Sequence, residues 1–220
     1  MNYDYIKQGD CLELMRDIPD KSIDMVLCDL PYGVLNKNNP DTRWDKPLDL
    51  GLLWRQYERV VKDNAAIVLF SQGMFTADLM LSNRKWWRYN LVWDKQRVTS
   101  FLNANRMPMR CHEDICVFYK KQPVYHPQYV VGLPNHPRGN GQHKDTNRCY
   151  GRYGNDYQGR TYSSVPRCAS TVPEGMKLPR SIISIKKEHE STVLHPTQKP
   201  IALLRWLIRT YSDVGGGGSG

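Results

Sequence analysis

Residues 29–33 combine a carboxylate, a proline, an aromatic ring and a glycine at the end of a short apolar run. The run at residues 23–28 carries almost no charge, which is typical of a strand buried inside a parallel sheet. Ligands bind beyond the carboxyl ends of such strands, where Asp29 stands. Pro31 fixes its own φ, and Gly33 lets the chain turn at little steric cost. The stretch therefore predicts either a plain turn or a site that holds a flat ring with an amino group.

Asp29, Leu30, Pro31 and Tyr32 resemble the Asp-Pro-Pro-Tyr tetrad of DNA amino-methyltransferases. These enzymes transfer a methyl group from S-adenosylmethionine to adenine N6 or cytosine N4. Leu30 departs from the commonest form and matches a variant of phage-type members. In that family an Asp in the first position is associated mainly with adenine and a Ser mainly with cytosine. The resemblance implies an adenine-N6 methyltransferase, with cytosine-N4 transfer as the alternative.

Other stretches fall where the β class of this family has its motifs. They are residues 9–12, 18–22, 91–95, 112–118 and 195–200. The resemblance implies a Rossmann-like α/β methyltransferase sheet with S-adenosylmethionine as the cofactor. It also implies cofactor contacts from Asp10, Cys11, Asp29, His195, Thr197, Gln198 and Lys199. For Asp10, a helix N-cap is an equally good interpretation.

Methylation of an amino group requires the kinds of side chain that residues 29–32 provide. The lone pair of an exocyclic amino group is delocalised into the ring, so the enzyme must localise it. Asp29 and the carbonyl of Leu30 or Pro31 could accept the two N–H bonds and stabilise the positive charge that develops on nitrogen. Asp29 could also accept the released proton. A base in a duplex must flip out at a cost of a few kcal/mol, which stacking on Tyr32 would partly offset by roughly 1–3 kcal/mol.

Composition fits one globular domain with a substantial core. The chain has 220 residues, of which 40% are hydrophobic. No apolar run approaches about 18 residues, and residues 1–5 show no signal-peptide pattern. We expect a soluble cytoplasmic protein, associated with the nucleoid of a bacterial or phage-infected cell. The six cysteines form no Cys-x-x-Cys pair, so no metal is expected, although a zinc site could be assembled on paper from Cys111, His112 and Cys116 with others.

Hydrophobic periodicity predicts alternating helices and strands. Helices are expected at residues 11–16, 48–62, 74–81 and 201–211, and strands at residues 3–6, 23–28, 65–70, 86–93 and 115–119. The polar stretch at residues 34–47 predicts a flexible connection. We expect residues 1–120 to form the catalytic core, to which residues 191–214 return as a helix on the cofactor side.

Residues 121–187 differ from the rest, with eleven Lys or Arg against three Asp or Glu in a chain of net charge +9. Basic residues interleaved with tyrosines suit phosphate neutralisation and base stacking. We predict that residues 121–190 are a target-recognition region for double-stranded DNA, with a solvated loop as the alternative. The expected DNA contacts are Lys95, Arg106, Arg138, Lys144, Arg148, Arg152 and Arg160.

Residues 215–220 are all Gly or Ser and are typical of a flexible linker. In the family that this chain resembles, a strand and a Gly-rich cofactor loop follow the helix that corresponds to residues 201–211. We therefore expect either a truncated chain, with an exposed apolar edge on the strand at residues 23–28, or a second polypeptide that completes the sheet. The alternative function is a catalytically incomplete DNA-binding module.

Overall fold

A computed structural model describes residues 6–35, 38–99, 101–132, 172–188, 195 and 197–213. Two units are distinguished, Met1–His126 with Arg180–Gly220, and Pro127–Pro179. In the second unit, β5 (Val130–Val131) and β6 (Met176–Lys177) form an antiparallel ribbon. The predicted DNA contacts Arg138, Lys144, Arg148, Arg152 and Arg160 lie outside the described residues, as does most of the strand predicted at residues 3–6.

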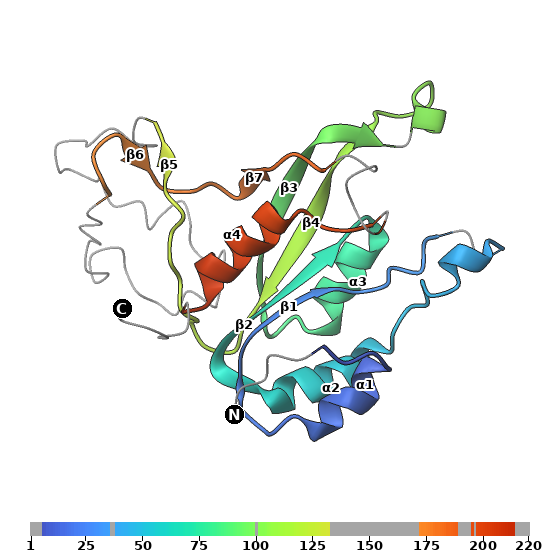
Figure 1. The fold of residues 1–220 in the computed structure, drawn as a ribbon, viewed down its shortest axis with the longest axis vertical. Helices are drawn as coiled ribbons and strands as arrows, with labels where there is room; N and C mark the ends of the chain where they lie inside the picture. The colour runs from blue at the N-terminus through green and yellow to red at the C-terminus, as the bar shows by residue number, and fades with distance from the viewer. Residues whose placement is uncertain are drawn as a thin grey trace, which may run out of the picture. The chain divides into compact units, whose positions relative to one another are not determined.

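The first unit is an α/β fold around a five-stranded mixed sheet with the strand order β1-β2-β4-β3-β7 (Figure 1). The strands are β1 (Ile23–Asp29), β2 (Val61–Ser71), β3 (Trp87–Thr99), β4 (Arg110–Phe118) and β7 (Ile182–Ser184). β1 runs parallel to β2, and β3 runs parallel to β7, whereas β4 is antiparallel to both β2 and β3. The α/β class is as predicted.

β1 forms one edge of the sheet among the described strands. The apolar run alone predicts an interior strand, whereas the expectation of an exposed edge on residues 23–28 agrees with this position. Its apolar side chains are partly buried because both faces of the strand are covered. Ile23, Val26 and Cys28 pack against one hydrophobic cluster, and Met25 and Leu27 pack against the other. Coverage of the two faces, rather than a second neighbouring strand, explains the apolar run.

Helices cover the two faces of the sheet. They are α1 (Cys11–Leu14), α2 (Leu50–Val60), α3 (Met74–Ser82) and α4 (Ile201–Tyr211), with short 3-10 turns η1 (Met15–Asp17), η2 (Pro40–Thr42) and η3 (Phe101–Asn103). α2 and α3 contribute to one cluster and α4 to the other, so they lie on opposite faces (Figure 1). Among the described residues, none of the helices has the length and apolar character needed to cross a membrane.

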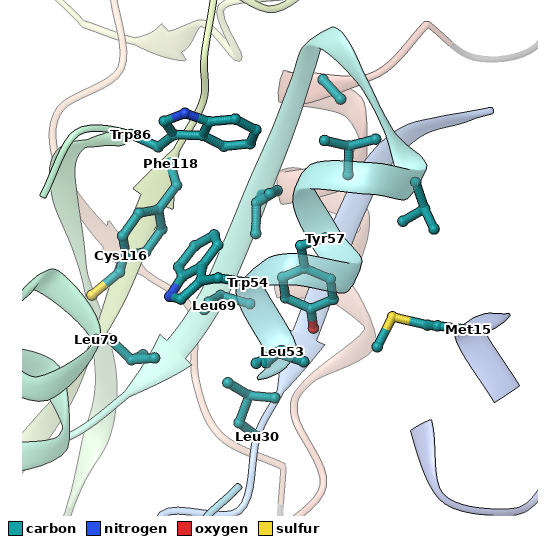
Figure 2. Close-up of a cluster of buried hydrophobic side chains, with 14 of the residues drawn as sticks. Met15, Leu30, Leu53, Trp54, Tyr57, Leu69, Leu79, Trp86, Cys116 and Phe118 are labelled. Atoms are coloured by element: carbon teal, nitrogen blue, oxygen red, sulfur yellow. The ribbon is translucent and has the colours of Figure 1, made fainter. Parts of the chain in front are cut away.

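The hydrophobic cluster beneath α2 also contains Leu30, the residue that follows β1. Figure 2 shows Trp54 and Tyr57 of α2 lying over the sheet among Leu53, Leu69 and Phe118. The rings of Trp54 and Phe118 are 4.8 Å apart, and the Trp54 indole N–H donates to Ser82 Oγ at 2.7 Å. A buried Leu in such a core is worth about 2–5 kcal/mol against Ala, so this side of the sheet is firmly packed.

The β3–β4 hairpin is longer than the strands predicted at residues 86–93 and 115–119. Asp94 pairs with His112 and Thr99 with Arg110, which leaves extra residues of β3 in a bulge. Gln96 lies in this bulge at φ 51°, a conformation that is uncommon for a residue other than glycine. Its N–H donates to Asp94 Oδ1 at 3.0 Å, which supports the bulge. The alternation that marks a strand is lost across a bulge, so the sequence did not reveal the strand's full length.

Candidate active site

The loop that follows β1 is held by contacts before and after Pro31. Leu30 is buried among the residues of the cluster beneath α2. Gly33 has φ 70° and donates its N–H to Asp45 Oδ1 at 2.9 Å, and the N–H of Leu35 donates to Asp45 Oδ2 at 2.8 Å. Asp45 is itself buried. The expected flexible connection at residues 34–47 therefore contains an anchor, and sequence reasoning missed Asp45 because nothing in a polar stretch distinguishes a buried carboxylate.

Tyr32 lies against Asp29. Its hydroxyl donates to Asp29 Oδ1 at 2.9 Å, and its ring stacks on Phe75 with centroids 5.1 Å apart. Burial, followed by the negative charge of Asp29, raises the pKa of Tyr32. The phenol therefore stays protonated and remains a donor to Asp29 at physiological pH.

Four charged side chains meet beside the tetrad. Lys199 Nζ lies 2.9 Å from Asp29 Oδ2 and 3.2 Å from Glu113 Oε2, and Lys95 Nζ lies 3.3 Å from Glu113 Oε1. The side chains of Lys199 and Lys95 are only 8% and 4% exposed. Glu113 Oε2 is buried and accepts no well-oriented hydrogen bond, although Lys199 is within ion-pair distance. Glu113 thus depends on the two lysines for compensation of its charge.

Lys95 is a buried member of this cluster. Burial lowers the pKa of its ammonium, and the neighbouring Glu113 opposes that effect. Its ammonium is engaged in a buried ion pair with Glu113, and its DNA contact stays a prediction. Arg106 is exposed on the loop after η3, and its DNA contact stays a prediction.

A cavity of about 320 Å³ opens at the carboxyl end of β1. It is lined by Leu27, Cys28, Asp29, Phe70, Thr197, Gln198, Lys199 and Leu204. The structure thus brings four of the predicted cofactor contacts, Asp29 and residues 197–199, to one place. Its volume is at the lower end of the roughly 300–1,000 Å³ typical of small-molecule sites. Apolar walls with a few convergent polar groups are also typical of such sites.

His195 stabilises the turn that places residues 197–199 in the cavity lining. Its Nδ1 lies 2.9 Å from Thr197 Oγ1, and its carbonyl accepts the N–H of Gln198 at 3.0 Å. Its ring meets the edge of Trp44 at 5.7 Å between centroids. His195 does not line the cavity, so any direct cofactor contact stays a prediction.

Asp10 and Cys11 also lie outside the cavity lining. Asp10 Oδ1 accepts the N–H of Leu12 at 2.8 Å, which confirms its interpretation as a helix N-cap. Cys28 does line the cavity, and burial raises the pKa of its thiol. In the part of the chain that the structure describes, no group of three or more His, Cys, Asp or Glu side chains is placed to hold a metal ion.

A family model described as DNA methylase, of the N6/N4 type, matches residues 23–217. The chain belongs to this DNA methylase family. It is 28% identical over 133 residues to the Type II methyltransferase M.HinfI of Haemophilus influenzae, an alignment that covers 48% of this chain and 37% of that protein. It is 26% identical over 231 residues to the Type II methyltransferase M.BglII of Bacillus subtilis, covering 94% of this chain and 56% of that protein.

Solved DNA methyltransferases have the same fold as this family member. The PvuII DNA methyltransferase (cytosine-N4-specific) aligns with a TM-score of 0.55 at 12% identity, over 93% of this chain and 69% of that one. M1.HpyAVI aligns with a TM-score of 0.50 at 16% identity, over 94% and 75%. These findings confirm the predicted family and fold. The chain spans less than two thirds of the length of M.HinfI and M.BglII, and its assignment to the β class or to phage-type members stays a prediction.

Proposed function

We propose that this DNA methylase carries the catalytic site of an S-adenosylmethionine-dependent DNA amino-methyltransferase, with adenine N6 as the acceptor. The observation that supports this most strongly is the meeting of the tetrad Asp29, Leu30, Pro31 and Tyr32 with residues 197–199 at one cavity. These two segments are far apart in the sequence. The sheet and α4 hold them together at the carboxyl end of β1, where ligands bind in α/β folds.

Asp29 is the acceptor for the target amino group. Oδ1 already receives the Tyr32 hydroxyl and Oδ2 faces Lys199, but each carboxylate oxygen has a second lone pair. Asp29 therefore retains the capacity to accept an N–H of the amino group and then its proton. The buried Leu30 side chain and the Asp45 anchor fix the backbone on either side of Pro31, which positions the carbonyl acceptors before substrate arrives.

The side chains that line the cavity are of the kinds that would bind S-adenosylmethionine. Leu27, Phe70 and Leu204 offer apolar walls to an adenine ring, and Thr197, Gln198 and Lys199 offer polar groups to an amino acid end. When bound, this cofactor supplies an electrophilic methyl group on a sulfonium. The chain's own contribution is to bind it next to Asp29, so that the amino group and the methyl meet in one orientation.

Cytosine N4 is the second candidate acceptor. The fold neighbour PvuII is cytosine-N4-specific by its title, and the same acceptors would serve an N4 amino group. The Asp in the first tetrad position favours adenine. Because the geometry of the carboxylate suits both amino groups, the two acceptors are distinguished by identifying the methylated nucleoside that the enzyme produces.

The test is transfer of a radioactive methyl group from labelled S-adenosylmethionine to unmethylated genomic DNA, followed by chromatography of the nucleosides. We expect labelled N6-methyladenine from the wild type and a loss of about 10²–10³-fold or more in Asp29→Asn. The matched control is Asp24→Asn, an exposed carboxylate at the other end of β1 that pairs with Lys62. Undiminished transfer by Asp29→Asn would remove Asp29 from the mechanism. N4-methylcytosine would favour the second acceptor, and DNA binding without transfer would favour a DNA-binding module.

A further inference from the structure

The tip of the β3–β4 hairpin exposes a group of apolar side chains. This hairpin tip, residues 97–99 and 101–110, contains η3 and the loop after it. Its exposed apolar residues are Val98 (50%), Phe101 (73%), Leu102 (84%), Met107 (50%) and Met109 (42%). Single exposed apolar residues need no explanation, but a cluster of them at one place marks an interaction surface.

The same tip is uniformly basic. Arg97, Arg106 and Arg110 belong to it, and residues 97–110 include no Asp or Glu. Exposed apolar groups beside arginines, with no carboxylate among them, suit a partner that has both a polyanionic backbone and flat apolar rings. A nucleic acid is the macromolecule with that chemistry.

The tip extends past the end of the sheet at which the candidate active site lies. Asp29 pairs with Phe70 near the end of β2, and Ser71, the last residue of β2, pairs with Asp114 of β4. β4 begins at Arg110, four residues beyond Asp114, so the hairpin extends about 13 Å past the end of β2. Figure 1 shows the hairpin reaching beyond the ends of β1 and β2. A duplex that brings a base to Asp29 would therefore meet the hairpin tip.

The tip is also internally ordered. The N–H of Ala104 donates to the Phe101 carbonyl at 3.0 Å, and Asn103 accepts the N–H groups of Arg106 at 2.8 Å and Met107 at 3.0 Å. The bulge around Gln96 lies at the base of this tip. Phe101 and Leu102 are thus presented on a preformed turn, which lowers the entropic cost of inserting them into a partner.

We propose that the hairpin tip is a wedge that enters duplex DNA beside the extruded base, with Phe101 and Leu102 in the base stack and Arg106 on a phosphate. The proposal rests on DNA being the substrate in the proposed function. Extruding a base leaves a gap in the stack, and apolar side chains inserted at a base step are a known way for proteins to hold DNA unstacked. The wedge would fill the gap while Asp29 holds the extruded base.

A second copy of this chain fits the tip less well. In a two-fold symmetric dimer the same patch faces itself, so the three arginines of one tip would approach those of the other. Residues 97–110 include no Asp or Glu, so the facing tip would offer these arginines no carboxylate. Charge therefore favours DNA over self-association.

The experiment needs neither the recognition sequence nor catalysis. Fluorescence anisotropy compares binding to a labelled 24-bp duplex of arbitrary sequence with binding to the same duplex carrying one central abasic site. The wedge enters a pre-existing gap at lower cost, so the wild type should prefer the abasic duplex by about fivefold or more. F101S/L102S should abolish the preference, and Arg106→Gln should weaken binding to both duplexes. The control Leu81→Ser, an exposed apolar residue of α3, should keep the preference.

Equal affinity of the wild type for the two duplexes, or a preference that survives in F101S/L102S, would overturn the wedge. So would sedimentation showing a wild-type dimer that F101S/L102S converts to monomer, since the tip would then serve self-association. Far-ultraviolet circular dichroism verifies that the double variant is folded. If the abasic preference depends on Phe101 and Leu102 but no methyl transfer is found, the proposed function fails while the wedge stands.

Discussion

Lys199 Nζ lies 2.9 Å from Asp29 Oδ2, which ties the turn before α4 to the end of β1. Glu113 on β4 stands on the other side of the same ammonium at 3.2 Å. One buried cation therefore compensates two carboxylates that come from different strands.

Removal of this cation should destabilise the fold strongly. Lys199→Met leaves Asp29 and Glu113 facing each other with only Lys95 nearby, and loss of one partner from a buried pair costs about 3–5 kcal/mol. Urea unfolding measures the change in free energy. The control Lys120→Met breaks an exposed pair with Asp63 and should cost less than about 1 kcal/mol. Equal costs for the two variants would show that the cluster contributes no more than a surface pair.

Two variants should distinguish the contribution of the Tyr32 hydroxyl to the rate of methyl transfer from the contribution of its ring. Tyr32→Phe removes the donor to Asp29 Oδ1 but keeps the stacking on Phe75, so methyl transfer should fall by less than about tenfold. Tyr32→Ala also removes the aromatic platform for the base and should fall by a further factor of about ten or more. Initial rates with labelled S-adenosylmethionine provide both numbers. Identical losses in the two variants would assign the whole effect to the hydroxyl.

Gly33→Ala should disrupt the loop more than Gly73→Ala. Both glycines have positive φ, at 70° and 60°. A Cβ on Gly33 would overlap Pro47, whereas a Cβ on Gly73 would meet nothing within 4 Å. Gly73, at φ 60° and ψ −132°, lies in a region used almost only by glycine, so Gly73→Ala reports the backbone strain alone, about 1–3 kcal/mol. Thermal unfolding compares the two variants, and a larger loss in Gly73→Ala would contradict the close packing of Gly33 on Pro47.

The acid limb of stability should depend on Asp63. Hydrogen bonds from Lys120 and Lys121 lower the pKa of Asp63 to about 2, below the value of about 3.9 for an unperturbed Asp. A depressed pKa gives stability that is complete above about pH 4 and is lost as the pH falls toward about 2. Asp63→Asn should therefore flatten the dependence of Tm on pH in this window. Asp78→Asn, an exposed residue of α3, is the control, and an unchanged slope in Asp63→Asn would contradict the prediction.

The thiols should differ in their reaction with iodoacetamide. Burial raises the pKa of Cys116 to about 11, so at pH 8 only about one in a thousand of these thiols is ionised, and the group is also shielded. Cys111 is exposed on the same strand. Peptide mapping by mass spectrometry should find Cys111 alkylated in the native protein and Cys116 alkylated only after unfolding. Early modification of Cys116 would mean that β4 opens readily.

Sequence patterns located the regular elements well where periodicity is uninterrupted. α4 was predicted with its observed bounds because Pro200 precedes it and Leu203, Leu207 and Tyr211 share one face. β2 begins at Val61, immediately after α2, although its first residues alternate too weakly to indicate a strand. Contacts that depend on tertiary structure were not predictable from local pattern, since each joins segments that are distant in the sequence.

In the candidate site, too, the motif residues could be predicted from the sequence and their tertiary contacts could not. Asp29 and residues 197–199 were identified by motif and meet at one cavity. Glu113 lay in a recognised segment but received no role, because only the fold reveals that it stands between Lys95 and Lys199. A buried lysine also looks identical to a surface lysine in sequence, so the burial of Lys95 could not be predicted.

The bulge around Gln96 limits how this methylase can be recombined with its relatives. The bulge lies between Lys95, which belongs to the ion cluster, and the hairpin tip, so a change in the bulge would affect both. A chimaera whose junction within residues 94–99 changes the number of residues in the bulge would shift the register of the residues beyond the junction and would move Lys95 away from Glu113. Junctions should therefore be placed at Val92 and Asp114, which pair below the bulge, so that the hairpin is exchanged as one module.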